Sequence, residues 1–155
     1  MKNFFRAWCL ALLSIHATAV FAAAADVQLA NVWARATAPG QKTAAVYMDI
    51  TSDTDAALVA AASTVAERVE LHRSSHDDGV MRMRPAAKIE LPARKAVKLA
   101  PGGVHLMLVN VKRPLREGDR VALVVSVQGR DGLRKIETEA VVRGLTDSHP
   151  HQHRH

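Results

Sequence analysis

The chain has 155 residues, of which 48% are hydrophobic, 23% charged and only 4% aromatic, with a formal net charge of +6. This length suits one ordinary domain, and the ample supply of Val, Leu, Ile and Ala excludes disorder throughout the chain. With so few aromatic side chains, the chain has no stacking platform for single-stranded nucleic acid. We therefore interpret the basic surplus as solvated surface charge and predict no nucleic-acid partner.

The N-terminus has the composition of a secretion signal. Two basic residues precede a mostly apolar stretch over residues 7–21, and the alanines at 22–25 are typical of a cleavage site. We therefore predict that residues 1–25 are removed on export to the periplasm, with no stable membrane insertion afterwards. Cys9, the only cysteine, lacks the small residues that should precede a lipidated cysteine, and it leaves with the signal. The exported chain then has no thiol for a disulfide or a metal site.

The rest of the chain has the pattern of short strands separated by turns. Apolar residues alternate with polar ones between segments rich in Gly, Pro and Asp, and no convincing amphipathic helix is present. Strands are predicted, in chain order, at 27–35, 43–52, 56–62, 69–72, 80–84, 89–91, 96–99, 104–111, 121–127 and 133–142. The polar segment at 74–79 is predicted as a loop. A succession of short strands at this spacing predicts an all-β sandwich or barrel.

Histidine and methionine side chains gather in the predicted strands at 80–84 and 104–111 and at the end of the strand at 69–72. Residues two apart in a strand point to the same face, so His105 and Met107 project together while the residues between them face the core. Met81 and Met83 share a face of their strand, and His72 ends its strand just before the polar segment. If these strands are neighbours, two imidazoles and one or two thioethers converge at one end of the sheet.

Such a donor set is soft and uncharged. Thioether sulfur prefers Cu(I) among the common metal ions, whereas Zn(II) favours Cys, His or carboxylate, and Ca(II) and Mg(II) favour oxygen. Four protein ligands leave no open position, which favours carriage over catalysis. The residues alone leave a plainer alternative open, because a single Met on a strand is usually core filler. A histidine within the apolar strand at 104–111 nevertheless needs a polar partner or a metal.

The spacing H-x10-M-x21-H-x-M, formed by His72, Met83, His105 and Met107, resembles the motif of the periplasmic copper chaperone family called PCu(A)C. The similar surrounding segments are WARAT at 33–37, AAVYMDITS at 44–52, VELH at 69–72, DDGVMRMRP at 77–85 and PGGVHLML at 101–108. The resemblance covers roughly residues 26–142. It implies a cupredoxin-like, Greek-key β-sandwich that binds Cu(I) through these four side chains.

One residue near the motif departs from the family pattern, and one methionine beside it lies outside the motif. Many members have a Met two residues after the first His, where this chain has Ser74. Met81 shares a face with Met83 but has the wrong spacing for the motif, so we expect it to pack against the core or to support the ligands.

The resemblance further implies a copper chaperone rather than an enzyme. Its copper acceptor would be the CuA centre of cytochrome c oxidase, reached directly or with Sco-type chaperones of thioredoxin fold. We predict a monomer with the metal site near the surface, because an acceptor must reach the ion. Two alternatives stay open: a periplasmic copper storage or tolerance protein, and a non-metal β-sandwich interaction module in which the four side chains do not converge.

The C-terminal end differs in composition from the predicted strands. Its imidazoles are His149, His151, His153 and His155. A flexible imidazole cluster suits Cu(II), which favours nitrogen donors in a tetragonal array, whereas a solvated tail with incidental metal affinity is the alternative. Similar extensions in some PCu(A)C members are associated with a second, Cu(II) site. We therefore predict three parts: a signal peptide over 1–25, a copper-binding β-sandwich over 26–143 and a flexible His-rich tail over 144–155.

Overall fold

The computed structural model describes residues 27–77 and 80–145, and within these ranges it contains ten β-strands and no helix. In chain order the strands are β1 Val27–Arg35, β2 Thr43–Ser52, β3 Ala56–Ala62, β4 Ala66–Asp77, β5 Val80–Pro85, β6 Ile89–Leu91, β7 Val97–Leu99, β8 Val104–Val111, β9 Arg120–Gly129 and β10 Gly132–Arg143. The predicted all-β class is therefore confirmed. None of the described segments forms a helix of the length and apolarity that a bilayer span requires.

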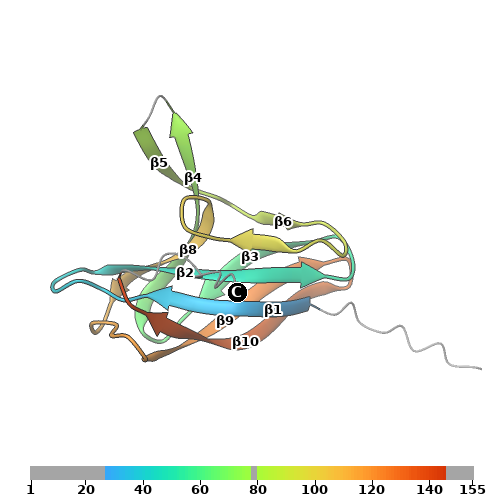
Figure 1. Ribbon diagram of the computed structural model, residues 1–155. Coiled ribbons are helices and arrows are strands. Elements are labelled where there is room, and N and C mark those ends of the chain that lie inside the picture. Colours follow the sequence, from blue (N-terminus) through green and yellow to red (C-terminus); the bar gives the residue numbers. More distant parts are fainter. Residues whose placement is uncertain (1–26, 78–79, 146–155) are drawn as a thin grey trace, which may run out of the picture.

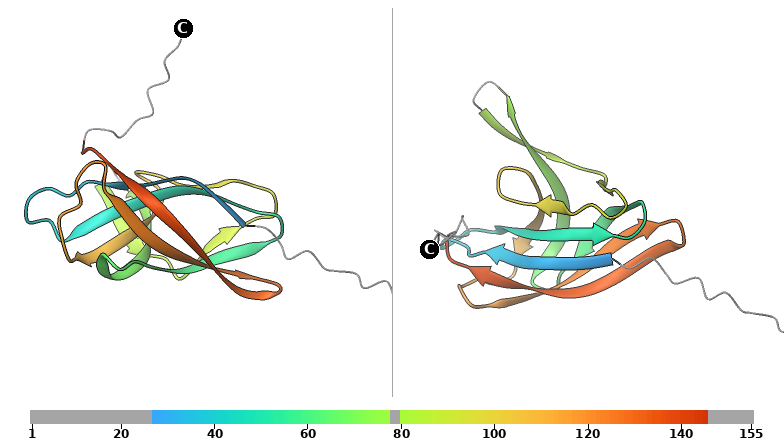
Figure 2. Two further views of the ribbon diagram at one scale, coloured as in Figure 1. Left: turned by 90° about the horizontal axis from the view of Figure 1, so that it is seen from below. Right: turned by 45° about the vertical axis from the view of Figure 1, so that its right-hand side comes forward.

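The strands form one continuous hydrogen-bonded sheet that folds back on itself. Their order is β5-β4-β8-β2-β1-β10-β9-β3-β6, and β7 pairs with β2 beside this path. The described pairs are antiparallel except β1 with β10, which run parallel. Strands β3 and β9 lie behind β1 and β2 in Figure 1, and the views of Figure 2 show the same layered body. The fold is a sandwich.

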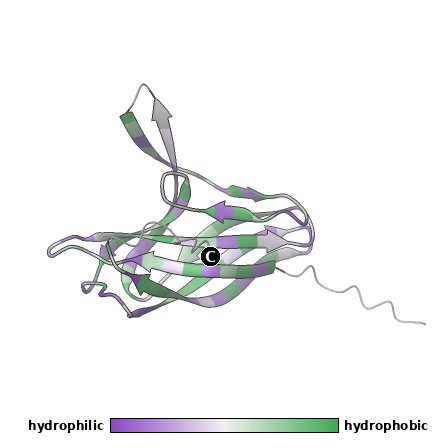
Figure 3. Cartoon of the chain, in the orientation of Figure 1, coloured by the Kyte–Doolittle hydropathy of each residue, from purple (hydrophilic) through white to green (hydrophobic). Residues whose placement is uncertain are grey.

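Aliphatic side chains from both layers fill the space between them. Val46 of β2 and Leu106 of β8 come from one layer, and Leu58 of β3 and Val125 of β9 come from the other; all four are fully buried. Hydrophobic and hydrophilic bands alternate along the strands in Figure 3, as the two-residue period of a strand requires. Burying each such side chain contributes about 1.5–3 kcal/mol, which makes this core the main source of stability.

Strand β4 is longer than the sequence predicts. We expected a short strand ending at His72 and a loop over 74–79, but β4 continues to Asp77 and pairs there with β5. The backbone hydrogen bonds of this hairpin outweigh the polar composition, because a solvated antiparallel pair tolerates polar side chains. The outer parts of β4 and β5 rise from the sandwich as an arm (Figures 1 and 2). Strand β5 of this arm carries Met83, one of the four residues of the predicted metal site.

Candidate metal centre

A row of rings crosses four neighbouring strands on the sheet face opposite the core side chains. Trp33 of β1 pairs with Tyr47 of β2, and His105 of β8 pairs with His72 of β4. The ring centroids are 4.5 Å apart for Trp33 and Tyr47, and 6.2 Å apart for Tyr47 and His105. Those of His105 and His72 are 5.8 Å apart. Strand pairing thus places the two predicted imidazole ligands side by side.

Thioethers flank the two imidazoles on the same face. Met107 follows His105 by two residues on β8, and Met83 of β5 pairs with Ser74, which follows His72 by two residues on β4. A cavity of about 390 Å³ is lined by Met83, His105 and Met107, among others. His72 adjoins this cavity through its ring contact with His105. The structure therefore brings all four motif residues to one face of three adjacent strands.

Exposure is graded across the four side chains. His105 is only 4% exposed and Met107 is half-buried. The His72 side chain is 15% exposed, whereas Met83 on the arm is 53% exposed. His105 is thus the most buried of the four side chains, and the thioether of Met83 faces solvent.

His105 is held as a neutral ring with one free nitrogen. Its Nδ1–H donates a hydrogen bond to the carbonyl oxygen of Gly103 over 3.2 Å. Burial lowers the pKa of His105, more than the Gly103 carbonyl raises it, and the neighbouring His72 lowers it further. With Nδ1 carrying the proton, the lone pair lies on Nε2. That nitrogen needs no deprotonation to bind a metal.

His72 presents a buried nitrogen that the protein does not satisfy. Its Nε2 lies 2.9 Å from Oε2 of Glu70, and since a carboxylate only accepts, Nε2–H is the donor. The opposite nitrogen, Nδ1, is buried and has no hydrogen-bond partner among the described residues. An unpartnered buried polar atom costs about 1–3 kcal/mol. A bound metal ion would remove that cost.

The spacing of the two rings fits a shared ion. With metal–nitrogen bonds of about 2 Å, two imidazoles on one ion have ring centroids no more than about 6 Å apart. The observed separation of 5.8 Å lies within that limit. The described residues contain no group of three or more His, Cys, Asp and Glu arranged to hold a metal. The donors at this face are instead two imidazoles and thioether sulfurs.

Glu70 is a residue of the candidate site that our sequence analysis missed. It receives hydrogen bonds from Nε of Arg68 over 2.7 Å and from His72 over 2.9 Å. The Arg68 bond, followed by the His72 bond, lowers the pKa of Glu70, so its carboxylate is charged near neutral pH. A carboxylate that accepts from a histidine fixes which ring nitrogen faces the metal. The two-residue spacing from His72 is the signal that could have revealed it.

Replacing Glu70 by Ala should weaken Cu(I) binding by ~10- to 100-fold, the usual effect of losing a hydrogen-bond partner of a metal ligand. Competition with a Cu(I) chelator under anaerobic conditions measures the affinity, and ¹⁵N NMR of the imidazoles reports the tautomer of His72. Glu67→Ala is the matched control, because Glu67 lies on the same strand and pairs with Asn110 and, more loosely, with Arg68, whereas the His72 ring bonds to Glu70. Unchanged affinity together with an unchanged tautomer would exclude a positioning role for Glu70.

Met81 differs from its expected environment. We expected it to pack against the core or to support the ligands, but its side chain is 51% exposed on the arm, so core packing is wrong for this residue. Every residue of β5 is exposed, so both faces of this strand lie away from the sandwich interior. The predicted tail ligands His149, His151, His153 and His155 lie outside the described residues, as does the predicted signal peptide.

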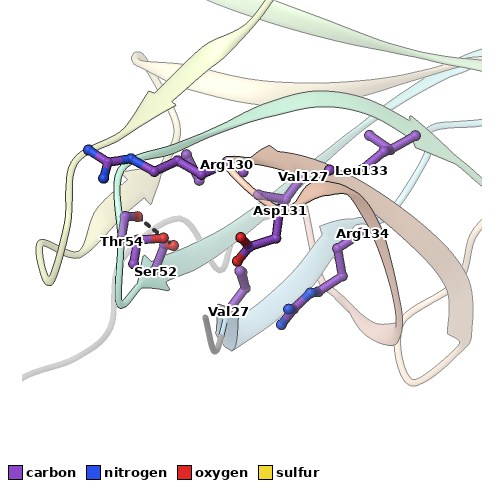
Figure 4. Close-up of a pocket in the computed structure, with 11 residues that line it drawn as sticks. Val27, Ser52, Thr54, Val127, Arg130, Asp131, Leu133 and Arg134 are labelled. Atoms are coloured by element: carbon purple, nitrogen blue, oxygen red, sulfur yellow. Dashed lines mark hydrogen bonds between the residues drawn. The ribbon is translucent and has the colours of Figure 1, made fainter. Parts of the chain in front are cut away.

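A second cavity lies at the other end of β2 and has different chemistry. It has a volume of about 130 Å³, and its lining includes Val27, Thr54 and Asp131 (Figure 4). At its edge the Ser52 hydroxyl donates to the carbonyl oxygen of Thr54 over 2.7 Å. No His, Met or Cys contributes to its lining. It offers none of the soft donors found beside the arm.

Comparison with known proteins places the chain in a family. The family model described as "Putative lipoprotein LpqE-like" matches residues 27–137. The chain belongs to the LpqE-like family. A protein of Leifsonia xyli subsp. xyli, named "Putative lipoprotein Lxx21020", is 31% identical over 100 residues, which cover 64% of this LpqE-like chain. The LpqE-like chain spans 60% of the length of that relative.

Solved structures resemble the LpqE-like chain over most of its length. The copper-bound PCuAC domain from PmoF2 has a TM-score of 0.61 at 22% identity, covering 76% of this chain and 92% of that domain. The Cu(I)-bound solution structure of DR1885 from Deinococcus radiodurans has a TM-score of 0.56 at 31% identity, covering 74% of this chain and 76% of that one. These likenesses confirm the cupredoxin-like fold and the resemblance to PCu(A)C proteins.

Proposed function

We propose that this chain is a copper chaperone that binds one Cu(I) ion through His72, Met83, His105 and Met107. The observation that carries this proposal is the buried, unpartnered Nδ1 of His72 beside the neutral ring of His105. Two thioethers on the same face complete the donor set. The printed names of two structural relatives, one copper-bound and one Cu(I)-bound, support the choice of metal.

The donor set favours the monovalent ion. Two neutral nitrogens and two neutral sulfurs form a soft set that suits Cu(I) better than Zn(II), Ca(II) or Mg(II). Thioethers carry no proton to lose, and burial keeps His105 neutral. Glu70 holds His72 so that Nδ1 remains available. Since four protein donors fill a four-coordinate ion, the site suits carriage of copper rather than catalysis.

The exposure gradient supports delivery over storage. Met83 is half-exposed on an arm that rises from the sandwich, so an acceptor can displace this thioether first. The more deeply buried imidazoles of His72 and His105 then release the ion last. The PCu(A)C resemblance points to the CuA centre of cytochrome c oxidase as the acceptor, directly or through a Sco-type chaperone. A storage protein would gain nothing from an exposed ligand.

A strain lacking this chain should lose cytochrome c oxidase activity when copper is scarce. Oxygen consumption with a cytochrome c electron donor measures that activity. The wild-type gene should restore it, whereas a gene carrying both His72→Ala and His105→Ala should not. Full oxidase activity in the deleted strain, together with sensitivity only to excess copper, would favour the storage alternative instead.

We propose that the protein acts in the periplasm as a monomer. The names of its family and of its Leifsonia relative describe lipoproteins, which supports a place in the cell envelope. Because Cys9 lacks the small residues that precede a lipidated cysteine, we propose release by cleavage after residues 22–25 rather than lipidation. A second site, for Cu(II) on the tail histidines, also stays a prediction.

A further inference from the structure

Met81 provides a third thioether beside the proposed metal centre that the four-residue motif does not use. It precedes Met83 by two residues on β5, so both lie on the same face of the arm. Both line the cavity to which His105 and Met107 also contribute. Met81 is 51% exposed and Met83 is 53% exposed, so the core accounts for neither side chain. Three thioether sulfurs thus line this cavity, whereas the proposed Cu(I) site uses two of them.

Met81 occupies the outer position of the two. Met83 pairs with Ser74 near the middle of the hairpin, whereas Met81 pairs with His76, two residue pairs closer to the turn. Strand β5 is at the end of the sheet and pairs only with β4 among the described strands, so its other edge is open. Figures 1 and 2 show this arm extending away from the sandwich. A molecule that approaches along the arm reaches Met81 before the inner donors.

We propose that Met81 is a transfer ligand, which binds Cu(I) while the ion enters or leaves the inner site. This inference rests on the proposed function of the four inner donors. In the exchange a Cu–S bond to Met81 forms as a bond to one inner donor breaks. The ion remains Cu(I), and because a thioether is neutral, neither an electron nor a proton moves. At equilibrium the inner donors hold the ion and Met81 is unbound.

Met81→Leu tests the proposal, because the change conserves volume and removes only the sulfur. Excess bathocuproine disulfonate takes Cu(I) from the loaded full-length protein, and the colour of its complex gives the transfer rate. We expect transfer ~10-fold slower than in the wild type, which corresponds to about 1.4 kcal/mol in the barrier. The equilibrium Kd should not change, because the lost ligand slows association and dissociation equally.

Two further variants separate the outcomes. Val80→Leu alters the opposite face of the same exposed strand and should transfer copper at the wild-type rate. Met83→Leu should weaken the equilibrium affinity. Wild-type transfer by Met81→Leu, or a loss of affinity equal to that of Met83→Leu, would overturn the role of Met81 as a transfer ligand. Unchanged affinity in Met83→Leu would instead contradict the proposed inner site.

Discussion

Replacing His105 by Ala should lower the affinity for Cu(I) by more than ~100-fold, which is above the usual effect of losing a ligand's hydrogen-bond partner. The ring is 4% exposed, is neutral because burial lowers its pKa, and lies 5.8 Å from the ring of His72. In the proposed site, its loss removes one of two nitrogen donors, and the remaining three side chains cannot complete a four-coordinate ion. Anaerobic competition with bicinchoninic acid measures the change.

Folding must be separated from binding in this experiment. Because His105 is buried, circular dichroism and thermal unfolding of the metal-free variant should accompany the titration. Met107→Leu provides a second variant, since it keeps the side-chain volume and removes only the sulfur. It too should bind Cu(I) more weakly than the wild type. If both folded variants bound copper as tightly as the wild type, the proposed site would be wrong.

Leu106→Ala should lower the free energy of unfolding by about 2–5 kcal/mol, the usual result of truncating a buried leucine. Leu106 lies between His105 and Met107 on β8, but it points to the other face and is fully buried. Its register partners are Val46 of β2 and Leu71 of β4, which are also buried. The smaller side chain leaves a cavity that this packed layer cannot fill. Urea denaturation monitored by circular dichroism measures the loss.

The neighbouring residues should separate stability from binding. Met107→Leu should change copper affinity and leave the unfolding midpoint nearly unchanged, whereas Leu106→Ala should do the reverse while the protein remains folded. Leu133→Ala is the control for truncation, because Leu133 of β10 is 55% exposed and its loss should cost less than about 0.5 kcal/mol. A Leu106→Ala midpoint equal to that of the control would contradict the core assigned to β8.

Alternation along single strands was predictable because it is a local property of the extended backbone. It places His105 and Met107 on one face of their strand and Leu106 on the other. The structure agrees, because Leu106 is fully buried in the core. The same reasoning placed Met81 beside Met83. It was wrong about where β4 ends, because local composition at 74–77 is polar and the pairing partner that extends the strand follows the turn.

Register between strands was beyond the reach of local reasoning. Whether His72 meets His105 depends on how β4 aligns with β8, and a shift of one residue would turn one imidazole to the opposite face. The environment of His72 depends on the same alignment, because the packing around its ring is what buries Nδ1. Glu70 acquires its role only once that orientation is known.

The amino-acid sequence by itself determined the strand-rich class, the motif spacing and the kinds of donor atoms, because these follow from residue chemistry and a two-residue period. Only the tertiary structure decided that the proposed donors from β4, β5 and β8 share one face, and that Met81 stands exposed on an arm. The physical reason is that long-range strand pairing, and not local sequence, sets which side chains become neighbours and which remain in solvent.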